Sequence, residues 1–393
     1  MSKHRVVIVG GGFGGIQTAL KLSDDKRFVV TLVTNRPDFH YFPSLYRTAT
    51  GGKRMISSIP LTEIFDSKPV EILLDEAVSI DKEKQLLVTK VGHKIHYEAL
   101  VLALGVQTNY FNIEGLKELS FGIKTPDDAE ELKAHLHRQL IDEGKPDTNY
   151  VIIGGGPTGI ELAGSLVTYL KHMLKSHGLE QRTIHVDLVE AAARLVPRMP
   201  RDISSMIRRR LRKLGVRLYL KTAVQAQTAD ALMVHDKAIR SHTVVWTAGV
   251  TNNPFFRNNA FQLTKAGKVR VDQYLQSEPG VYVVGDNADT PYSGMAQTAL
   301  NDGSYLAANL KRVASKEDPL PYRAKKPIYV FPAGEGWAAV LWGKVRLYGR
   351  VGWVLRSLAD LVAYHDFEPW QLAARRWLAQ DDTEESCSFC NKN

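Results

Sequence analysis

The sequence predicts an α/β protein in which one parallel-sheet domain is inserted into another. Two glycine-rich turns and a third short motif carry this prediction. The turn Gly10-x-Gly12-x-x-Gly15 follows the apolar run 6–9, and the turn Gly154-x-Gly156-x-x-Gly159 follows the apolar run 151–153. The third motif is the apolar run 281–284, which ends in Gly285-Asp286. Since each turn leaves a strand and enters a helix, we expect two Rossmann-like domains in one chain.

The spacing of the glycines indicates that each domain binds a dinucleotide. The first glycine permits a tight turn, the second lets the backbone approach a pyrophosphate, and the third lets helix and strand pack closely. The helix that follows presents free N–H groups and the positive end of its dipole to the phosphates. A ligand-free glycine turn would explain one such site but not two in the same context. We therefore expect electrons to pass between two bound dinucleotides.

An acidic residue follows the second fingerprint. The strand expected at 186–189 ends in Glu190, which lies 31 residues after Gly159. The usual spacing is about 20 residues, and a long helix over 157–177 explains the difference. A carboxylate at this place accepts hydrogen bonds from a ribose diol and repels a 2′-phosphate, which favours NADH over NADPH. Arg194 lies nearby in the sequence and leaves the use of NADPH open.

No acid follows the first fingerprint. The strand expected at 31–33 ends in Thr34 and Asn35. Their hydroxyl and amide groups form neutral rather than charge-assisted hydrogen bonds with a ribose. We assign this slightly atypical site to FAD, because a buried strand ending in Gly285-Asp286 is typical of FAD domains.

The second fingerprint repeats the first after 144 residues, and the chain then returns to the first domain. Apolar runs that end in Gly105 and Gly249 close the two expected sheets. We therefore predict a discontinuous FAD-binding domain over 1–115 and 247–326. An NADH-binding domain over 116–246 is inserted in it, followed by an α-rich amphipathic, membrane-associating region over 327–378 and a flexible tail over 379–393.

The composition limits the classes of function. The 393 residues suffice for two or three domains, and the net charge is +9. No nucleic-acid motif accompanies this charge, so we expect no nucleic-acid partner and interpret it as attraction to anionic lipid. We expect no signal peptide and no transmembrane helix. Cys387 and Cys390, the only cysteines, lie in the polar tail without a second ligand pair, so we predict no metal site and leave a redox role open.

The region 327–378 holds five of the six tryptophans, and its part 337–378 mixes them with six basic residues and three acidic ones. Helical spacing of apolar residues over 349–361 predicts one amphipathic helix, and 369–378 is a second candidate. One interpretation is a helix packed on the body of the protein. The other, which we favour, is an anchor lying in the membrane plane. A charge of +3 would contribute roughly 3 kcal/mol of attraction to anionic lipid, so the apolar face must supply the rest.

These motifs together resemble the two-dinucleotide-binding-domain flavoproteins of the pyridine nucleotide-disulfide oxidoreductase-like family. Among these, the chain is most similar to type II NADH dehydrogenase, the non-pumping NADH:quinone oxidoreductase. Residues 154–164 match the NADH fingerprint nearly residue for residue, and residues 39–46 resemble the flavin-side segment. The similarity runs through about residues 4–310. The family expects an acid where Thr34 stands and a second glutamine where Asn301 stands, and these departures bear on FAD affinity and on the quinone site.

The resemblance implies specific site residues. The residues implied for FAD are Gly10, Gly12, Gly15, Thr34, Asn35, Pro43, Ala103, Gly105, Gly285, Asp286, Ala296 and Gln297. Those implied for NADH are Gly154, Gly156, Thr158, Gly159, Glu161, Glu190, Ala248 and Gly249. Gln297 and Asn301 are implied to contact a quinone, and Glu161 and Gln297 to act in catalysis. For Glu161, a carboxylate that is merely satisfied by the helix dipole is the alternative.

The implied function is transfer of electrons from NADH through FAD to a quinone, by an enzyme bound peripherally to the inner, cytoplasmic face of the cell membrane. Homodimer formation is left open. Two alternatives remain: a soluble NAD(P)H-dependent reductase with a protein acceptor such as ferredoxin, and a flavin redox sensor with slow turnover. No cysteine occurs before residue 387, which disfavours disulfide reductases and sulfide:quinone oxidoreductases, because both need cysteines within the body of the protein.

Overall fold

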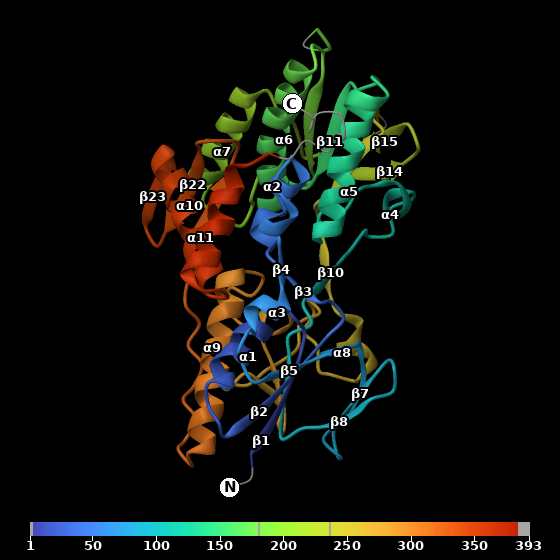
Figure 1. The fold of residues 1–393 in the computed structure, drawn as a ribbon. Helices are drawn as coiled ribbons and strands as arrows, with labels where there is room; N and C mark the ends of the chain where they lie inside the picture. Colours follow the sequence, from blue (N-terminus) through green and yellow to red (C-terminus); the bar gives the residue numbers. More distant parts are fainter. Residues whose placement is uncertain (1–2, 180, 236, 384–393) are drawn as a thin grey trace.

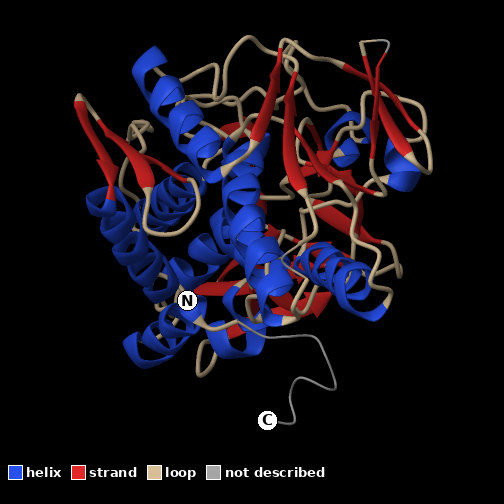
Figure 2. Ribbon diagram, turned by 90° about the horizontal axis from the view of Figure 1, so that it is seen from above, coloured by secondary structure: helices blue, strands red, loops and turns tan. Residues whose placement is uncertain are grey.

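The computed structural model describes residues 3–179, 181–235 and 237–383. Two α/β domains stand one above the other, and the C-terminal segment runs along one flank beside both (Figure 1). From above, long helices lie against the strands of the upper domain (Figure 2). The predicted pair of Rossmann-like domains is therefore present.

The first domain is built on a six-stranded sheet in the order β19-β20-β9-β1-β2-β5. The strands from β20 to β5 run parallel, and β19 is antiparallel at the edge. Helices α1 and α9 pack closely on each other beside this sheet. The sheet and its helices are β1 (His4–Val9), α1 (Phe13–Ser23), β2 (Phe28–Thr34), β5 (Val70–Leu74), β9 (Ala99–Leu102), β19 (Gln276–Glu278), β20 (Val281–Val283) and α9 (Ala296–Ala314).

Shorter elements decorate this domain between its main strands. A small antiparallel pair and several short helices follow β2: β3 (Asp38–His40), η1 (Phe42–Ser44), α2 (Leu45–Ala49), η2 (Arg54–Ile56), β4 (Ser58–Pro60) and α3 (Leu61–Ile64). A three-stranded antiparallel sheet and two short helices complete it: β6 (Ala77–Asp81), β7 (Leu86–Thr89), β8 (Lys94–His96), α8 (Pro254–Asn258) and η4 (Gly285–Asn287).

The second domain has a four-stranded parallel sheet in the order β13-β12-β11-β17. Its main elements are α5 (Pro126–His137), β11 (Asn149–Ile153), α6 (Pro157–Ser176), β12 (His185–Glu190), α7 (Arg201–Leu214), β13 (Arg217–Leu220) and β17 (Thr243–Trp246). Smaller elements are α4 (Leu116–Leu119), the π-helical turn η3 (Arg138–Asp142), β14 (Val224–Gln227), β15 (Ala231–Val234) and β16 (Lys237–Arg240). The long helix expected at 157–177 is thus α6.

The chain crosses between the domains twice, and the two crossings pair with each other. Strand β10 (Val106–Thr108) leads out of the first domain and β18 (Val250–Asn252) leads back into it. They form an antiparallel ladder in which Val106 faces Asn252. The second domain is therefore an insertion whose entry and exit form one short ribbon.

The C-terminal region differs from the α-rich prediction because it begins with a β-sheet. Strands β21 (Tyr329–Pro332), β22 (Ala338–Trp342) and β23 (Val345–Gly349) form an antiparallel sheet, followed by α10 (Arg350–His365) and α11 (Trp370–Leu378). Residues 379–383, expected in a flexible tail, instead pack on the body: η5 (Ala379–Asp381) follows α11, and Thr383 bridges to Gly52. Cys387 and Cys390 lie outside the described residues.

Candidate nucleotide and flavin sites

The first glycine turn forms a cradle that is tight at its ends and open in its middle. A Cβ added to Gly10 would lie 2.2 Å from the carbonyl oxygen of Ala103, and one added to Gly15 would lie 2.0 Å from that of Gly10. A Cβ added to Gly12 would meet nothing within 4 Å. Close approach by a pyrophosphate needs this combination, so the residues present fit FAD.

Two buried polar side chains that the sequence analysis missed hold the loops around this cradle. The Asn287 side chain accepts a hydrogen bond from Gly105 N (2.8 Å) and donates one to Gly105 O (2.7 Å). The Asp302 carboxylate accepts hydrogen bonds from Gly285 N (3.0 Å) and from the Tyr322 hydroxyl (2.5 Å). Burial raises the pKa of Asp302 to about 6, although both hydrogen bonds lower it. Together they fix the turn that presents Asp286, and only the Gly-Asp motif itself was visible in the sequence.

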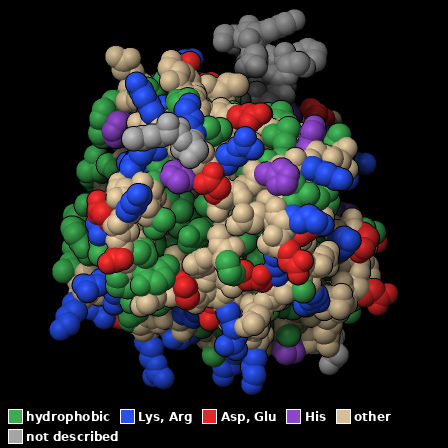
Figure 3. All heavy atoms as spheres, turned by 90° about the horizontal axis from the view of Figure 1, so that it is seen from below, with side chains coloured by type: hydrophobic (Ala, Val, Ile, Leu, Met, Phe, Trp, Pro, Cys, Tyr) green, Lys and Arg blue, Asp and Glu red, His purple; other side chains and the backbone are tan. Residues whose placement is uncertain are grey.

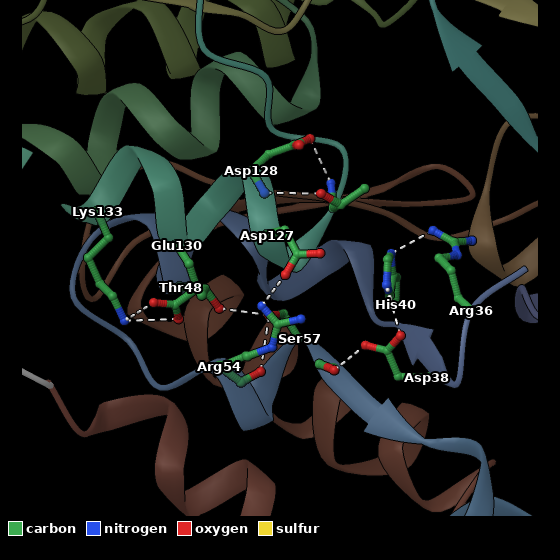
Figure 4. A network of polar contacts seen from close by, with 12 residues as sticks. Arg36, Asp38, His40, Thr48, Arg54, Ser57, Asp127, Asp128, Glu130 and Lys133 are labelled. Atoms are coloured by element: carbon green, nitrogen blue, oxygen red, sulfur yellow. Dashed lines mark hydrogen bonds and ion pairs between the residues drawn. The ribbon is translucent and has the colours of Figure 1, made fainter. Parts of the chain in front are cut away.

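The residues after β2 lie beside the cradle, and their side chains differ in burial and in hydrogen bonding. The buried Thr34 hydroxyl would lie 2.9 Å from a Cβ on Gly11, whereas Asn35 is exposed. Arg36 donates from Nη1 to His40 Nδ1 (2.7 Å), and His40 Nε2 lies 3.3 Å from Asp38 Oδ1 (Figure 4). Burial lowers the pKa of His40 to about 4, with a further contribution from the Arg36 charge, so this histidine is neutral at pH 7.

Two positive charges, Arg36 and Lys124, lie near each other on this side of the cradle, and Lys124 also lies near Asp286. The Arg36 Nε is buried and has no hydrogen-bond partner among the described residues. Lys124 Nζ lies over the Phe42 ring, 4.9 Å from its centroid, and burial lowers the pKa of Lys124 while Asp286 raises it. An uncompensated guanidinium nitrogen beside a phosphate cradle is a further observation that fits an anionic cofactor.

The second glycine turn repeats the geometry of the first. A Cβ on Gly159 would lie 1.9 Å from Gly154 O, and one on Gly154 would lie 3.0 Å from the Ala248 Cβ. A Cβ on Gly156 would meet nothing within 4 Å. Thr158 is half-buried on the first turn of α6, and Gly249 has a φ of +77° with the Phe111 ring against it. The predicted NADH residues of the turn therefore surround one open cradle.

Glu190 closes this cradle from the end of β12. Its two carboxylate oxygens accept hydrogen bonds from Gly155 N (2.6 Å) and Ala192 N (2.6 Å). The position of Arg194 in the sequence left the use of NADPH open. In the structure its side chain donates to the backbone oxygens of Met199 (2.6 Å) and Pro197. The carboxylate is thus fixed against the glycine turn at the end of β12, while the arginine is held by backbone carbonyls.

Glu161 is the fifth residue of α6 and lies in the second turn, where the helix dipole contributes little. Its side chain is half-buried. Burial raises the pKa of Glu161 to about 8; Arg356 lowers it, Asp360 raises it and Arg47 lowers it. A carboxyl group with this pKa holds a proton at neutral pH and releases it slightly above, which suits an acid or base rather than a permanently charged group.

The two predicted quinone residues lie one helical turn apart on α9, a different helix from that of Glu161. Gln297, next to Ala296 at the start of α9, is exposed, and its amide donates to Ile328 O (3.0 Å) and accepts from Ile328 N (3.0 Å). Asn301 is half-buried and lies within hydrogen-bonding reach of the Tyr322 hydroxyl. Pro43 lies in η1, and its carbonyl oxygen accepts a hydrogen bond from Arg356 Nη2 (3.0 Å).

Helix α10 has polar residues inside and apolar residues outside. Arg356, Asp360 and Tyr364 are buried against the body. Apolar side chains at i, i+3, i+7 and i+11 face out and are about half exposed: Val351 (60%), Val354 (54%), Leu358 (48%) and Val362 (53%). Hydrophobic side chains gather on this flank with Lys and Arg along its border (left in Figure 3). Of the apolar residues that predicted the helix, Val351, Val354 and Leu358 therefore face outward, whereas Leu361 packs against the core of the first domain.

The charge count of this region needs a correction. Six basic residues were expected to face lipid, but Arg356 and Arg376 are buried in ion pairs, Arg376 with Glu368 (2.7 Å). The acids Asp360 and Glu368 are buried with them. Lys344, Arg346, Arg350 and Arg375 remain exposed against Asp366, so the net exposed charge over 337–378 is still +3. Among the described residues, no helix has the length and apolarity needed to cross a bilayer.

The chain belongs to the pyridine nucleotide-disulphide oxidoreductase family, whose model matches residues 4–303. It is 32% identical over 361 residues to a type II NADH:quinone oxidoreductase of Mycobacterium tuberculosis. This alignment covers 84% of this chain and 77% of the relative. The type II NADH:quinone oxidoreductase of Staphylococcus aureus is 24% identical, over 80% of this chain and 84% of the relative. These relatives place the chain among the type II NADH:quinone oxidoreductases, and the family predicted from the sequence is confirmed.

Solved structures show the same fold at lower identity. NDH2 from Plasmodium falciparum in complex with NADH has a TM-score of 0.86, covers 96% of this chain and 97% of its own, and is 16% identical. The sulfide:quinone oxidoreductase of Aquifex aeolicus has a TM-score of 0.79 at 18% identity, over 99% of this chain and 94% of its own. At these identities the likeness concerns the fold alone.

Proposed function

We propose that this chain transfers electrons from NADH through FAD to a quinone while bound peripherally to a membrane. The observation that carries this proposal is the pair of open glycine cradles, the second with the Glu190 carboxylate hydrogen-bonded to its turn. The relatives named for this activity are similar over most of their length. The cofactors are FAD at the first cradle and NADH at the second.

The overall reaction consumes one proton: NADH, a quinone and one H⁺ give NAD⁺ and a quinol. When bound, FAD supplies the capacity to accept a hydride and to pass two electrons on. The chain's own residues bind, orient and supply the proton. Asp286, fixed by the hydrogen bond from Gly285 N to Asp302, would accept a hydrogen bond from the ribityl chain. The N-terminus of α9, beginning at Ala296, would stabilise negative charge near the flavin ring.

Glu161 is the residue we propose to hold and release the proton. Its pKa, raised by burial to about 8, keeps it protonated at neutral pH. Gln297 and Asn301 are proposed to contact the quinone from α9. Gln297 would then have to exchange its hydrogen bonds with Ile328 for contacts with the substrate. Glu190, with Arg194 held away by backbone carbonyls, would select NADH over NADPH.

The outward apolar row of α10 is the proposed membrane contact. Exposed Trp342 and Trp370 suit the headgroup zone, and the exposed cations border it. The inner, cytoplasmic face of the cell membrane is the proposed location, because anionic lipid there would attract a net positive flank. A quinone could then reach the flavin pocket directly from the bilayer.

The test of the activity is anaerobic addition of NADH to the flavin-loaded protein, followed by a soluble quinone analogue. Bleaching of the flavin absorbance by NADH and its return on quinone addition are expected. Flavin that is reduced but not reoxidised by quinone, yet is reoxidised by a protein acceptor, would move the function to a soluble reductase.

The membrane contact is tested by co-sedimentation with anionic vesicles. Val354→Glu combined with Leu358→Glu should abolish binding. The matched control is Val313→Glu with Leu320→Glu, two equally exposed apolar positions outside the C-terminal region, which should leave binding intact. Wild-type protein that stays in solution at low salt would reject the contact.

A further inference from the structure

The segment that follows β2 touches the first glycine cradle at both of its ends. At its start, the Thr34 hydroxyl accepts a hydrogen bond from Arg36 N (3.4 Å) and would lie 2.9 Å from a Cβ on Gly11. At its end, the Phe42 ring lies 6.2 Å from the ring of Phe13, the first residue of α1. Arg36 therefore belongs to a short stretch of chain that is held against the cradle from two sides.

Asp38 and His40 orient the Arg36 side chain (Figure 4). Arg36 Nη1 donates to His40 Nδ1 (2.7 Å), and His40 Nε2 lies 3.3 Å from Asp38 Oδ1. Because a guanidinium only donates hydrogen bonds, Nδ1 must accept, and the proton of the imidazole must be on Nε2, facing Asp38. The Ser58 hydroxyl donates to the other oxygen of Asp38. Since His40 is only 4% exposed and Asp38 15%, this chain of three side chains fixes the direction of the guanidinium.

The same chain leaves the positive charge of Arg36 without a direct counter-charge. The imidazole between Arg36 and Asp38 is neutral, and among the described residues no carboxylate forms an ion pair with the guanidinium. Arg36 Nε is buried and finds no hydrogen-bond partner in this part of the chain. A second cation, Lys124, lies with its Nζ 4.9 Å from the centroid of the Phe42 ring. A half-buried guanidinium with a free donor is destabilising unless an anion binds it.

We propose that Arg36 binds the pyrophosphate of FAD and that Asp38 and His40 are positioning residues for it. The inference rests on the part of the proposed function that puts FAD at the first cradle, and not on the quinone. An oriented guanidinium beside a glycine cradle supplies charge-assisted donors for a phosphate oxygen. The neutral Thr34 at the usual place of a ribose carboxylate is consistent with this arrangement. The first cradle thus holds its nucleotide mainly through the phosphates.

The first readout is the rate at which FAD leaves the loaded full-length protein, followed by flavin fluorescence after dilution at several salt concentrations. In the wild type, release should become faster with salt, because ions screen the attraction between guanidinium and phosphate. Arg36→Gln should release FAD about 10- to 100-fold faster at low salt and with a smaller dependence on salt. Arg36→Lys should keep the salt dependence but release FAD faster than the wild type, because an ammonium group lacks the planar fork of donors.

His40→Phe tests the positioning role. It keeps the charge of Arg36 but removes the acceptor that orients it, so FAD release should be faster than in the wild type while its salt dependence remains. The matched control is Arg27→Gln, at the opposite end of β2, where Arg27 pairs with Asp25 (2.6 Å). This variant removes an equal charge from the same domain, and it should leave FAD release and its salt dependence unchanged.

The second readout separates the phosphates from the ribose. ADP and 2′-deoxy-ADP compete with FAD for rebinding to the flavin-stripped full-length protein, and flavin fluorescence reports the first cradle alone. If Arg36 binds the phosphates, Arg36→Gln should weaken both competitors by the same factor. A preference for ADP over 2′-deoxy-ADP that is present in the wild type and lost in Arg36→Gln would assign Arg36 to the ribose and overturn the proposal.

Equal release rates in the wild type and Arg36→Gln would also overturn it, as would a change of the same size in Arg27→Gln. If Arg36→Gln does not fold, Arg36→Lys decides alone, and an unchanged release rate rejects the proposal. Failure of the proposed function looks different: the loaded wild type would not pass electrons from NADH to a quinone, while FAD release would still depend on Arg36.

Discussion

The two nucleotide cradles share one backbone geometry and differ in the side chain that ends the second strand of each domain. In both, the middle glycine faces open space and the outer glycines touch neighbouring backbone. In the inserted domain the carboxylate of Glu190 accepts hydrogen bonds from the backbone of the turn, and we propose that it also binds a ribose. In the first domain a neutral hydroxyl, Thr34, takes that position, and the nearby charge is positive, on Arg36. We therefore infer that the glycines supply nucleotide binding and that the side chains at the strand ends distinguish the nucleotide of one cradle from that of the other.

The largest effects are expected from closing each cradle separately. Gly12→Ala adds a methyl group that meets no protein atom, so the chain should fold normally but lose FAD affinity by roughly 100-fold, because the backbone no longer reaches the pyrophosphate. Gly156→Ala should keep the flavin colour and raise the KM for NADH by a similar factor. Flavin absorbance after gel filtration and the NADH dependence of flavin reduction measure the two losses. Loss of flavin in both variants would show that the cradles are not independent.

Removing the Glu190 carboxylate should weaken the preference for NADH over NADPH. Glu190→Ala loses charge-assisted hydrogen bonds worth about 1.5–3 kcal/mol, so the preference for NADH over NADPH should fall by about 10- to 100-fold. Arg194→Ala is the matched control, since its guanidinium is held by backbone oxygens, and it should change the preference little. Rates of flavin reduction by both nucleotides provide the ratio. Unchanged selectivity in Glu190→Ala would place the discrimination elsewhere.

Adding the missing carboxylate to the first site should have a smaller effect. Thr34→Asp introduces an acceptor for the FAD ribose diol in a side chain of similar size, and FAD should dissociate several-fold more slowly. The gain is limited because the Thr34 side chain is buried against Gly11. Release of FAD into dilute solution, followed by its fluorescence, measures the rate. Faster release of FAD from Thr34→Asp would indicate that the site near the positively charged Arg36 requires a neutral side chain at position 34.

The smallest expected effect is a change in stability with pH at Asp302, whose side chain supports the first cradle. Its pKa, raised by burial to about 6 from an ordinary 3.8, favours the protonated form in the folded state. The stability that it contributes is therefore complete below pH 3.8 and is lost as pH rises to about 6. The melting temperature of wild type minus that of Asp302→Asn should fall between pH 4 and pH 7. A flat difference would mean that Asp302 keeps one protonation state over this range.

Sequence reasoning succeeded where function depends on local backbone. The strand–turn–helix order placed both cradles, the long helix α6 and Glu190, because glycine spacing and apolar runs act over a few residues. Sequence reasoning did not predict which face of α10 is buried. The spacing of apolar residues shows that a helix has an apolar face, but not whether that face points to the core or to the outside. Arg356 and Asp360 meet Tyr41 and Pro43 across more than 300 residues, and no local pattern reports such a contact.

The sheet of the C-terminal region was missed for a different reason. Residues 338–342 form a short apolar run, and periodicity alone does not separate a buried strand from a helix segment of that length. The short segment 379–383 was likewise interpreted from its polar composition. Its order comes from contacts made elsewhere in the chain, such as the hydrogen bond from Arg47 Nη1 to the carbonyl oxygen of Gln380 (3.3 Å).

The C-terminal segment also fastens the two domains mechanically. Phe331 and Leu341 belong to the core of the inserted domain, whereas Tyr364 and Phe367 belong to that of the first. The β10–β18 ribbon carries both chain crossings between the domains, and such a short ribbon alone would allow the inserted domain to rotate about it. Because the C-terminal segment packs into both hydrophobic cores, it would oppose that rotation. We therefore expect the two domains to keep nearly the same relative arrangement when the nucleotide enters and leaves.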